Sequence, residues 1–435
     1  MKSIWMQVGD APHFEPLQEN KSTDVLIVGG GIAGILCVYK LTQAGVKCIL
    51  VEADQICGGV TAYTTAKITL GHSLIYDKLI KQFGAHKAGL YLEAQQKAIQ
   101  EYAQLCEQIP CDWEEKDNYV YSLDDPKKIQ QEIKALGALG VAVAYSEAGE
   151  LPIDVAGAVR IPKQAQFHPL KFLHAIARNL PIYAHTKVTE FMPGSVKTNF
   201  GTIRYNKLII ATHFPVLNKH GLFSLKMHQH RSYVIALKGA QDVRGMYVDE
   251  SGDGLSFRNY GNLLLLGGGG HRTGKKGGCW QELEDFAHRH YPKAEIVGKW
   301  ATQDCMTLDG VPYIGQYAKT LPDVYVATGF NKWGMTNSMV AANLLCDLVQ
   351  GRENPYVAVF NPSRSMLHLQ LGINAFESTV GLLTPTTPRC PHLGCALKYN
   401  KAEHTWDCPC HGSRFTREGE LVNGPATEDL CKKHI

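Results

Sequence analysis

The chain has 435 residues, of which 45% are hydrophobic and 20% charged, and its formal net charge is +3. This length predicts about three domains, and the small charge argues against nucleic acid or an anionic membrane as a partner. No apolar stretch is long enough to span a bilayer, and the first residues lack the pattern of a signal peptide, so we expect a cytoplasmic protein.

The first predicted unit is a strand, a glycine turn, a helix and a second strand. Residues 24–28 and 46–52 are the apolar strands, and a glycine-rich turn at 29–34 follows the first of them. Such glycines permit a tight turn and let the backbone approach a pyrophosphate at the helix N-terminus, while a terminal acidic residue accepts from a ribose hydroxyl. The pattern predicts dinucleotide binding by Gly29, Gly31, Ile32, Ala33, Gly34 and Glu52.

Two later blocks predict a substrate-binding domain that is threaded through the first domain. The block 76–149 is mainly helical, with long polar and apolar stretches at 87–108 and 126–139. The block 221–299 is rich in strands, as in residues 232–238.

A second glycine-rich turn, at 267–270, does not repeat the dinucleotide pattern. Counted from either of its first two glycines, the third required glycine falls on Arg272 or Thr273, and further glycines interrupt the helix that should follow. We therefore expect that NADH and NADPH are not the electron source, and that a substrate or an outside protein supplies the electrons.

A late strand and helix favour FAD as the dinucleotide. Residues 323–329 form a strand that ends in glycine, and the turn after it leads into an apolar helix over 339–348. The N-terminus of a helix in this place would stabilise the negative charge of a reduced flavin. Contacts with the flavin are expected from Gly329, Gly334, Met335 and Thr336.

With the strand at 207–212 and the turn at 310–315, these segments resemble the FAD-dependent oxidoreductases of the D-amino acid oxidase and glycine oxidase superfamily. The resemblance implies that the segment 57–67 wraps the flavin. Some members attach the ring to a histidine of this segment, whereas this chain has Tyr63 there, so we expect noncovalent FAD. Further expected contacts are Thr61, Thr65, Lys67 and Val188.

Two short motifs near the other end of the chain each combine cysteine with histidine. A Rieske [2Fe-2S] cluster needs two thiolates on one iron and two imidazoles on the other. A structural zinc site also takes two Cys and two His, but it would not require a further cysteine in each motif or the glycines beside them. The predicted cluster ligands are Cys390, His392, Cys408 and His411.

These motifs resemble the Rieske proteins of the cytochrome bc type. The resemblance implies a disulfide between Cys395 and Cys410, and a Ser413 hydroxyl that donates to a cluster sulfide. High-potential members carry a tyrosine where this chain has Phe415, and fewer hydrogen bonds to the sulfurs lower the reduction potential. Residues 363–389 predict a helix in place of most of the strands that usually precede the first motif. We therefore expect a smaller Rieske domain than usual, which depends on contacts with the rest of the protein.

The predicted fold class is therefore α/β. It comprises a Rossmann-like FAD-binding domain of the glutathione reductase type, an interleaved α+β substrate domain and a small all-β Rieske domain. The predicted ranges are 1–22 for an N-terminal extension, 23–75, 150–220 and 300–360 for the FAD-binding domain, 76–149 and 221–299 for the substrate-binding domain, 361–385 for a helical linker and 386–435 for the Rieske domain.

Together the two cofactors predict a dehydrogenase. The resembling flavoproteins take a hydride from a carbon next to an amine nitrogen, whereas a Rieske cluster accepts one electron at a time. We expect a small amine as substrate and an external carrier, namely a ferredoxin, a cytochrome or a quinone, as acceptor. The alternatives are a reductase that runs from ferredoxin or quinol through the cluster to FAD, and a non-catalytic redox sensor.

No motif identifies the residues that contact the substrate. Each candidate also has an ordinary structural explanation, such as a hydrogen-bonded loop histidine or an ion-paired cation. The candidates are Lys332, His168, His271, Tyr233 and Arg258, of which Lys332 lies in the flavin-facing turn, where a cation would stabilise reduced flavin.

Overall fold

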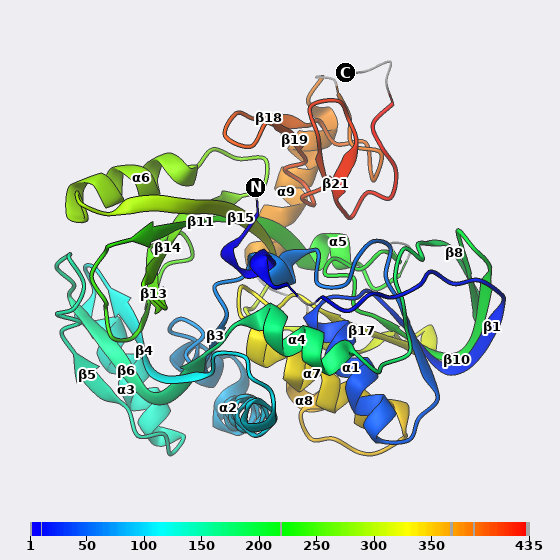
Figure 1. Ribbon diagram of the computed structural model, residues 1–435, viewed down its shortest axis with the longest axis horizontal. Coiled ribbons are helices and arrows are strands. Elements are labelled where there is room, and N and C mark those ends of the chain that lie inside the picture. The colour runs from blue at the N-terminus through cyan, green and yellow to red at the C-terminus, as the bar shows by residue number, and fades with distance from the viewer. Residues whose placement is uncertain (1, 10, 218–219, 366–368, 386–387, 432–435) are drawn as a thin grey trace.

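The computed structural model describes residues 2–9, 11–217, 220–365, 369–385 and 388–431. In this part of the chain three β-sheets are connected by helices that pack against parts of them (Figure 1). Among the described helices, none is both long and apolar enough to cross a membrane.

The first sheet contains the predicted dinucleotide-binding unit. Its strands follow the order β16-β17-β10-β1-β2-β7, and β17, β10, β1, β2 and β7 run parallel, while β8 and β9 extend it through antiparallel pairs. The helices α1 (Ile32–Gln43) and α7 (Gly334–Val349) share a core with β1 because both are apolar on nearly every side. The strands are β1 (Lys21–Val28), β2 (Cys48–Val51), β7 (Ile182–Tyr183), β8 (Val188–Met192), β9 (Ser195–Thr198), β10 (Thr202–Ile210), β16 (Tyr313–Ala318) and β17 (Leu321–Thr328).

The second sheet forms the other large layer. Its order is β15-β11-β14-β13-β12-β4-β6-β3, with β5 paired to β6. The strands are β3 (Lys67–Ile68), β4 (Glu114–Ser122), β5 (Ala144–Ser146), β6 (Gly157–Gln166), β11 (Met227–Lys238), β12 (Met246–Asp249), β13 (Ser256–Tyr260), β14 (Leu263–Arg272) and β15 (Glu295–Thr307).

Helices form where the sequence predicts them in this region. The helix α2 (Tyr76–Gln108) includes the predicted stretch 87–108 and has a kink at Gly84, whose φ is 81°. The helix α3 (Pro126–Ala138) begins after Asp125, whose carboxylate accepts from the backbone N–H groups of the first turn. The other helices are η1 (Ile4–Gln7), η2 (Val60–Tyr63), α4 (Pro169–Ala177), α5 (Phe223–Lys226), α6 (Cys279–His290), α8 (Val357–Phe360) and α9 (Leu369–Leu383).

The two large sheets interleave more deeply than the predicted ranges. The strand β6 lies in the predicted FAD-binding range 150–220, yet it pairs with β4 of the second sheet. The strand β15 likewise continues the second sheet past residue 300. Its backbone groups form hydrogen bonds with β11 along an antiparallel pairing that runs from Met227 opposite Thr307 to Lys238 opposite Glu295. Alternation of apolar residues predicts a strand but does not identify its partner.

A small domain, residues 388–431, follows α9 and lies next to β15 (Figure 1, orange and red). Its sheet has the order β18-β19-β20-β21, and its core is built from cysteines together with Leu397 and Phe415. The helix α9 packs on it closely, because a Cβ at Gly381 would lie 2.5 Å from Cys410 Sγ. The strands are β18 (Lys398–Asn400), β19 (Thr405–Asp407), β20 (Arg414–Phe415) and β21 (Leu421–Asn423).

Candidate functional site

A cavity of about 1250 Å³ is the main candidate site. Its wall is contributed by the first sheet at Val28 and Ala327, by the second sheet at Val234 and Thr302, and by the small domain at Leu421. All three sheets therefore meet at one internal space, which is large enough for a dinucleotide and a small substrate.

In the wall of the cavity, the glycine turn after β1 permits close backbone packing. Gly29 has φ 113°, and a Cβ there would lie 2.6 Å from the carbonyl oxygen of Ala211. A Cβ at Gly34 would lie 1.9 Å from the carbonyl oxygen of Gly29, so α1 can approach this turn only with glycine. Glu52 directly follows β2, beside the turn, and accepts from the backbone N–H of Gly30 at 2.6 Å.

Most of the predicted FAD contacts line this cavity. They are Gly29, Gly31, Ile32, Ala33, Glu52, Thr61, Thr65, Lys67, Val188, Gly329, Gly334 and Met335. Gly34 and Thr336 lie behind the wall: Gly34 packs against the glycine turn, and Thr336 Oγ1 is 3.0 Å from His72 Nε2.

Two buried cations beside the cavity fit an electron-rich cofactor. The ammonium of Lys67 lines the cavity and donates to Thr65 Oγ1 at 3.2 Å. Arg258, fully buried, donates to the carbonyl oxygens of Thr65 and Ala66 at 2.7 and 3.0 Å. Burial, and then the charge of Arg258, lowers the pKa of Lys67 to about 7. Positive charge buried in this way is stabilised by a negative or electron-rich group, which FAD would supply.

A buried histidine supports the flavin-facing turn, although no motif predicts it. His72 Nδ1 is 2.6 Å from the hydroxyl of Tyr91, and its ring stacks on Trp333 with centroids 4.9 Å apart. Burial lowers the pKa of His72 to about 3, so the ring is neutral. His72 thereby holds both Trp333 and Thr336 at the start of α7.

Charged side chains also line the cavity. Lys332 Nζ donates to the carbonyl oxygen of Gly252, and Asp253 Oδ1 lies 2.7 Å from His230 Nε2. Asp304, on β15, also lines the wall, and burial raises its pKa to about 6 although Lys332 favours its charged form. The sequence pattern did not indicate Asp304, because it lies inside a long strand without a motif.

The other weak substrate candidates have structural partners. His168 Nδ1 accepts from the backbone N–H of Lys171 at 3.2 Å and caps α4. The hydroxyl of Tyr233 donates to Glu403 of the small domain at 2.9 Å, and His271 Nε2 lies 3.0 Å from the same hydroxyl. Within the described wall of the cavity, Lys332 and Tyr233 are present, whereas His168, His271 and Arg258 are not.

The predicted cluster ligands meet in two pairs. A hydrogen bond with Cys408 lowers the pKa of the Cys390 thiol to about 7, and the rings of His392 and His411 lie with centroids 5.0 Å apart. The Nδ1 atoms of both histidines are buried and lack a hydrogen-bond partner among the described residues. Burial lowers the pKa of His392 to about 4 and that of His411 to about 3, so both imidazoles are neutral, as metal ligands must be.

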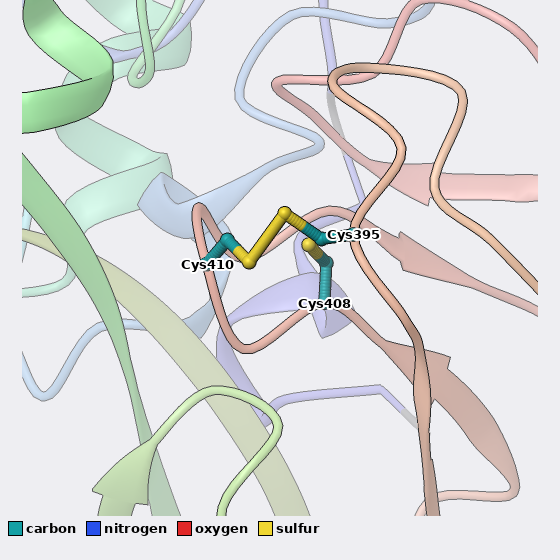
Figure 2. A group of neighbouring side chains, drawn as sticks. All are labelled: Cys395, Cys408 and Cys410. Atoms are coloured by element: carbon teal, nitrogen blue, oxygen red, sulfur yellow. A yellow bond between two sulfur atoms is a disulfide. The ribbon is translucent and has the colours of Figure 1, made fainter. Parts of the chain in front are cut away.

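Cys395 and Cys410 form the disulfide that the resemblance implies (Figure 2). The sulfur of Cys408 lies within 4.8 Å of both. Disulfide sulfurs are not thiolate ligands, so only Cys408 of this group is free to bind metal. Within the described chain, the four predicted ligands do not converge as one such compact group, which fits a two-iron cluster better than a single zinc ion.

Comparison with known proteins identifies both parts of the chain. Residues 24–348 match the family described as FAD dependent oxidoreductase, and residues 375–433 match the Rieske [2Fe-2S] domain. The putative Rieske 2Fe-2S iron-sulfur protein YhfW of Bacillus subtilis is 35% identical, over 99% of this chain and 97% of that protein. The chloroplastic iron-sulfur subunit of the cytochrome b6-f complex of Fritillaria agrestis is 39% identical over 20% of this chain and 32% of that protein.

Solved structures share the fold of the larger part. Glycine oxidase from Geobacillus kaustophilus has a TM-score of 0.67 and 20% identity, covering 80% of this chain and 100% of that one. L-proline dehydrogenase from P. horikoshii has a TM-score of 0.68 and 17% identity, covering 79% of this chain and 98% of that one. The chain therefore belongs to the FAD dependent oxidoreductase family, and it carries a Rieske [2Fe-2S] domain in addition.

Proposed function

We propose that the protein is a dehydrogenase that oxidises a small amine and passes the electrons one at a time through the Rieske cluster to an external carrier. The observation that carries this proposal is the shared cavity: most of the predicted FAD contacts and the Rieske residues 421–424 line the same space. When bound, FAD would supply a hydride acceptor for the substrate, and the cluster would supply a carrier of single electrons. The names of glycine oxidase and L-proline dehydrogenase, which share the fold, support a substrate with an amine nitrogen.

The charged side chains that line the cavity suit an amine. An amine must lose its ammonium proton before the adjacent carbon can release a hydride, and a carboxylate in contact with the substrate can accept that proton. Asp304 is placed for this role, since it lines the cavity and its pKa is raised to about 6. Lys332 and Lys67 supply positive charge at the same cavity, which would stabilise a reduced flavin.

Anaerobic mixing of the purified protein with a panel of amines and amino acids tests the proposal. Bleaching of the flavin absorbance, followed by the paramagnetic signal of a reduced Rieske centre, is the expected result. Reduction by ferredoxin or quinol alone, with no reduction by any amine, would show that electrons run in the opposite direction. Failure of every donor to reduce flavin and cluster together would leave the redox sensor as the function.

A further inference from the structure

Two glutamines attach the second loop of the cluster site to the second sheet. Gln229 Nε2 donates to the carbonyl oxygen of His411 at 2.9 Å and to that of Gly424 at 3.0 Å. Gln303 Nε2 donates to the carbonyl oxygen of Gly412 at 2.8 Å and also to Gln229 Oε1. The two side chains thus bind the backbone of a cluster ligand and of the residue after it.

The orientation of both amides is set by their partners. Both N–H bonds of each amide are used, and Gln303 Oε1 accepts from the hydroxyl of Thr273 at 3.1 Å. Both side chains are only 2% exposed, so an unpaired amide here would carry the full cost of its desolvation. This arrangement leaves each glutamine one orientation, with its N–H groups toward the Rieske domain.

The contact is also close in space. Gly412 has φ 86°, and a Cβ there would lie 2.5 Å from Cβ of Gln229. Only glycine therefore permits the ligand loop to rest directly on β11. Because His411 is buried while His392 is half-buried, the His411 side of the cluster site faces the flavoprotein part.

Gln229 touches both cofactor sites. It lines the cavity that contains the FAD contacts, and its amide binds His411. One side chain thus spans the distance from the cavity wall to the backbone of a cluster ligand.

We propose that Gln229, supported by Gln303, is the positioning residue that holds the His411 loop at a fixed distance from the flavin and provides the bonded route for electron exchange between the two cofactors. In each transfer, one electron leaves the reduced flavin and one is gained by the oxidised cluster, while no bond or proton changes at Gln229. Two transfers, separated by reoxidation of the cluster by the external carrier, account for the two electrons of one substrate. The claim rests on the proposed function only in that the two cofactors exchange electrons.

Flash photoreduction of the flavin in the anaerobic holoenzyme, with oxalate as the sacrificial electron donor, tests this claim without a substrate. The variants are Gln229→Met and Gln303→Met, which keep the length of the side chain and remove its N–H donors. The matched control is Gln316→Met, because Gln316 lies on β16 and donates within that edge of the first sheet, to Ala318. Iron, acid-labile sulfide and FAD contents are measured in each protein.

We expect Gln229→Met to slow reduction of the cluster after the flash by about tenfold or more, as for other small displacements of reacting groups. The photoreduction of the flavin should keep its rate, and the paramagnetic signal of the reduced cluster should shift because the His411 carbonyl loses a donor. Gln303→Met should slow the transfer less, since Gln229 keeps its bonds to the loop, and Gln316→Met should change nothing.

An unchanged rate in Gln229→Met with both cofactors present would overturn the proposal. If Gln229→Met loses the cluster, the result for Gln303→Met is used instead. An unchanged rate of cluster reduction and an unshifted paramagnetic signal in Gln303→Met would mean that these glutamines serve only the stability of the loop. Since light replaces the substrate, either result stands even if no amine reduces the flavin.

Discussion

The two cofactor sites of this protein are built in opposite ways. The predicted Rieske site uses side-chain donors that lie between residues 390 and 413, whereas the cavity that would hold FAD is lined by residues from Val28 to Glu428. In the first, a few atoms bind the cofactor directly. In the second, backbone turns, the shape of the cavity and several weak contacts together would bind the cofactor. A single substitution should therefore abolish binding of the cluster, whereas a single substitution in the cavity should only weaken the binding of FAD.

The largest effect is expected from His411→Ala, which removes one of the four predicted cluster ligands. Iron-sulfur absorbance and acid-labile sulfide should be lost, because the remaining donors cannot complete the two-iron site. Bound FAD should remain, since most of its predicted contacts line the cavity, whose described wall does not include His411. Visible spectra with iron and FAD assays measure both, and simultaneous loss of both cofactors would contradict the separation of the two sites.

Glu403→Gln should loosen the Rieske domain from the flavoprotein part. Glu403 is buried between Arg231, whose Nε donates to it at 3.0 Å, and Arg414, which donates at 2.8 Å. Removing its charge leaves two buried guanidinium groups without full compensation, a change that costs about 3 kcal/mol. Denaturant unfolding and limited proteolysis of the Rieske domain measure this loss.

The exposed carboxylate of Glu418 offers the matched control for this variant. Glu418→Gln should leave the unfolding midpoint unchanged, because no buried charge is left unpaired. Equal stability of Glu403→Gln and Glu418→Gln would mean that the buried ion pairs do not hold the domains together.

Asp304→Asn should change the pH profile of flavin reduction by an amine. In the unaltered protein the rate should fall as the pH drops through about 6, because Asp304 then gains a proton and no longer accepts one from the substrate. The variant should lose this acidic limb and react about a hundredfold more slowly. Anaerobic stopped-flow measurements between pH 5 and 8 are the test, and an acidic limb that persists in the variant would assign the titration to another group.

A smaller effect is expected on the cluster potential from Arg272→Met. The guanidinium of Arg272 donates to the carbonyl oxygens of Pro409 and Cys410 at 3.3 and 3.4 Å. A cation beside the cluster favours the reduced, more negative form, so its removal should lower the midpoint potential by tens of millivolts. A redox titration followed by electron paramagnetic resonance measures the change.

Lys276→Met is the control for that measurement, because Lys276 is an exposed cation near Arg272 in the sequence. Solvent screens such a charge, so the potential should hardly move. Equal shifts in the two variants would show that net charge, and not the position of Arg272, sets the potential.

Local sequence patterns predicted the glycine turn after β1, the helices α2 and α3 and the two cysteine-histidine motifs. In each case the interacting groups lie close in sequence, so spacing and residue type carry the information. The disulfide between Cys395 and Cys410 was expected from resemblance, and the structure joins these two residues.

The partners of long strands could not be predicted in the same way. Gln229 pairs with Cys305 and Gln303 with Arg231, so the two glutamines are diagonal neighbours on one face of the second sheet. Nothing in residues 227–238 or 295–307 alone indicates that this face meets the Rieske domain. Asp304 could not be predicted for the same reason, since which residues of a strand face the cavity is known only when the neighbouring strands are known.

By itself the sequence determined which cofactors this protein is built to hold, because the chemical groups that bind them lie within short segments. Only the tertiary structure decided that the predicted FAD contacts and part of the Rieske domain line one cavity, and that Gln229 lines it while it also binds the carbonyl oxygen of His411. The physical reason is that such contacts join side chains far apart in the chain, and their energies are realised only when the sheets pack together.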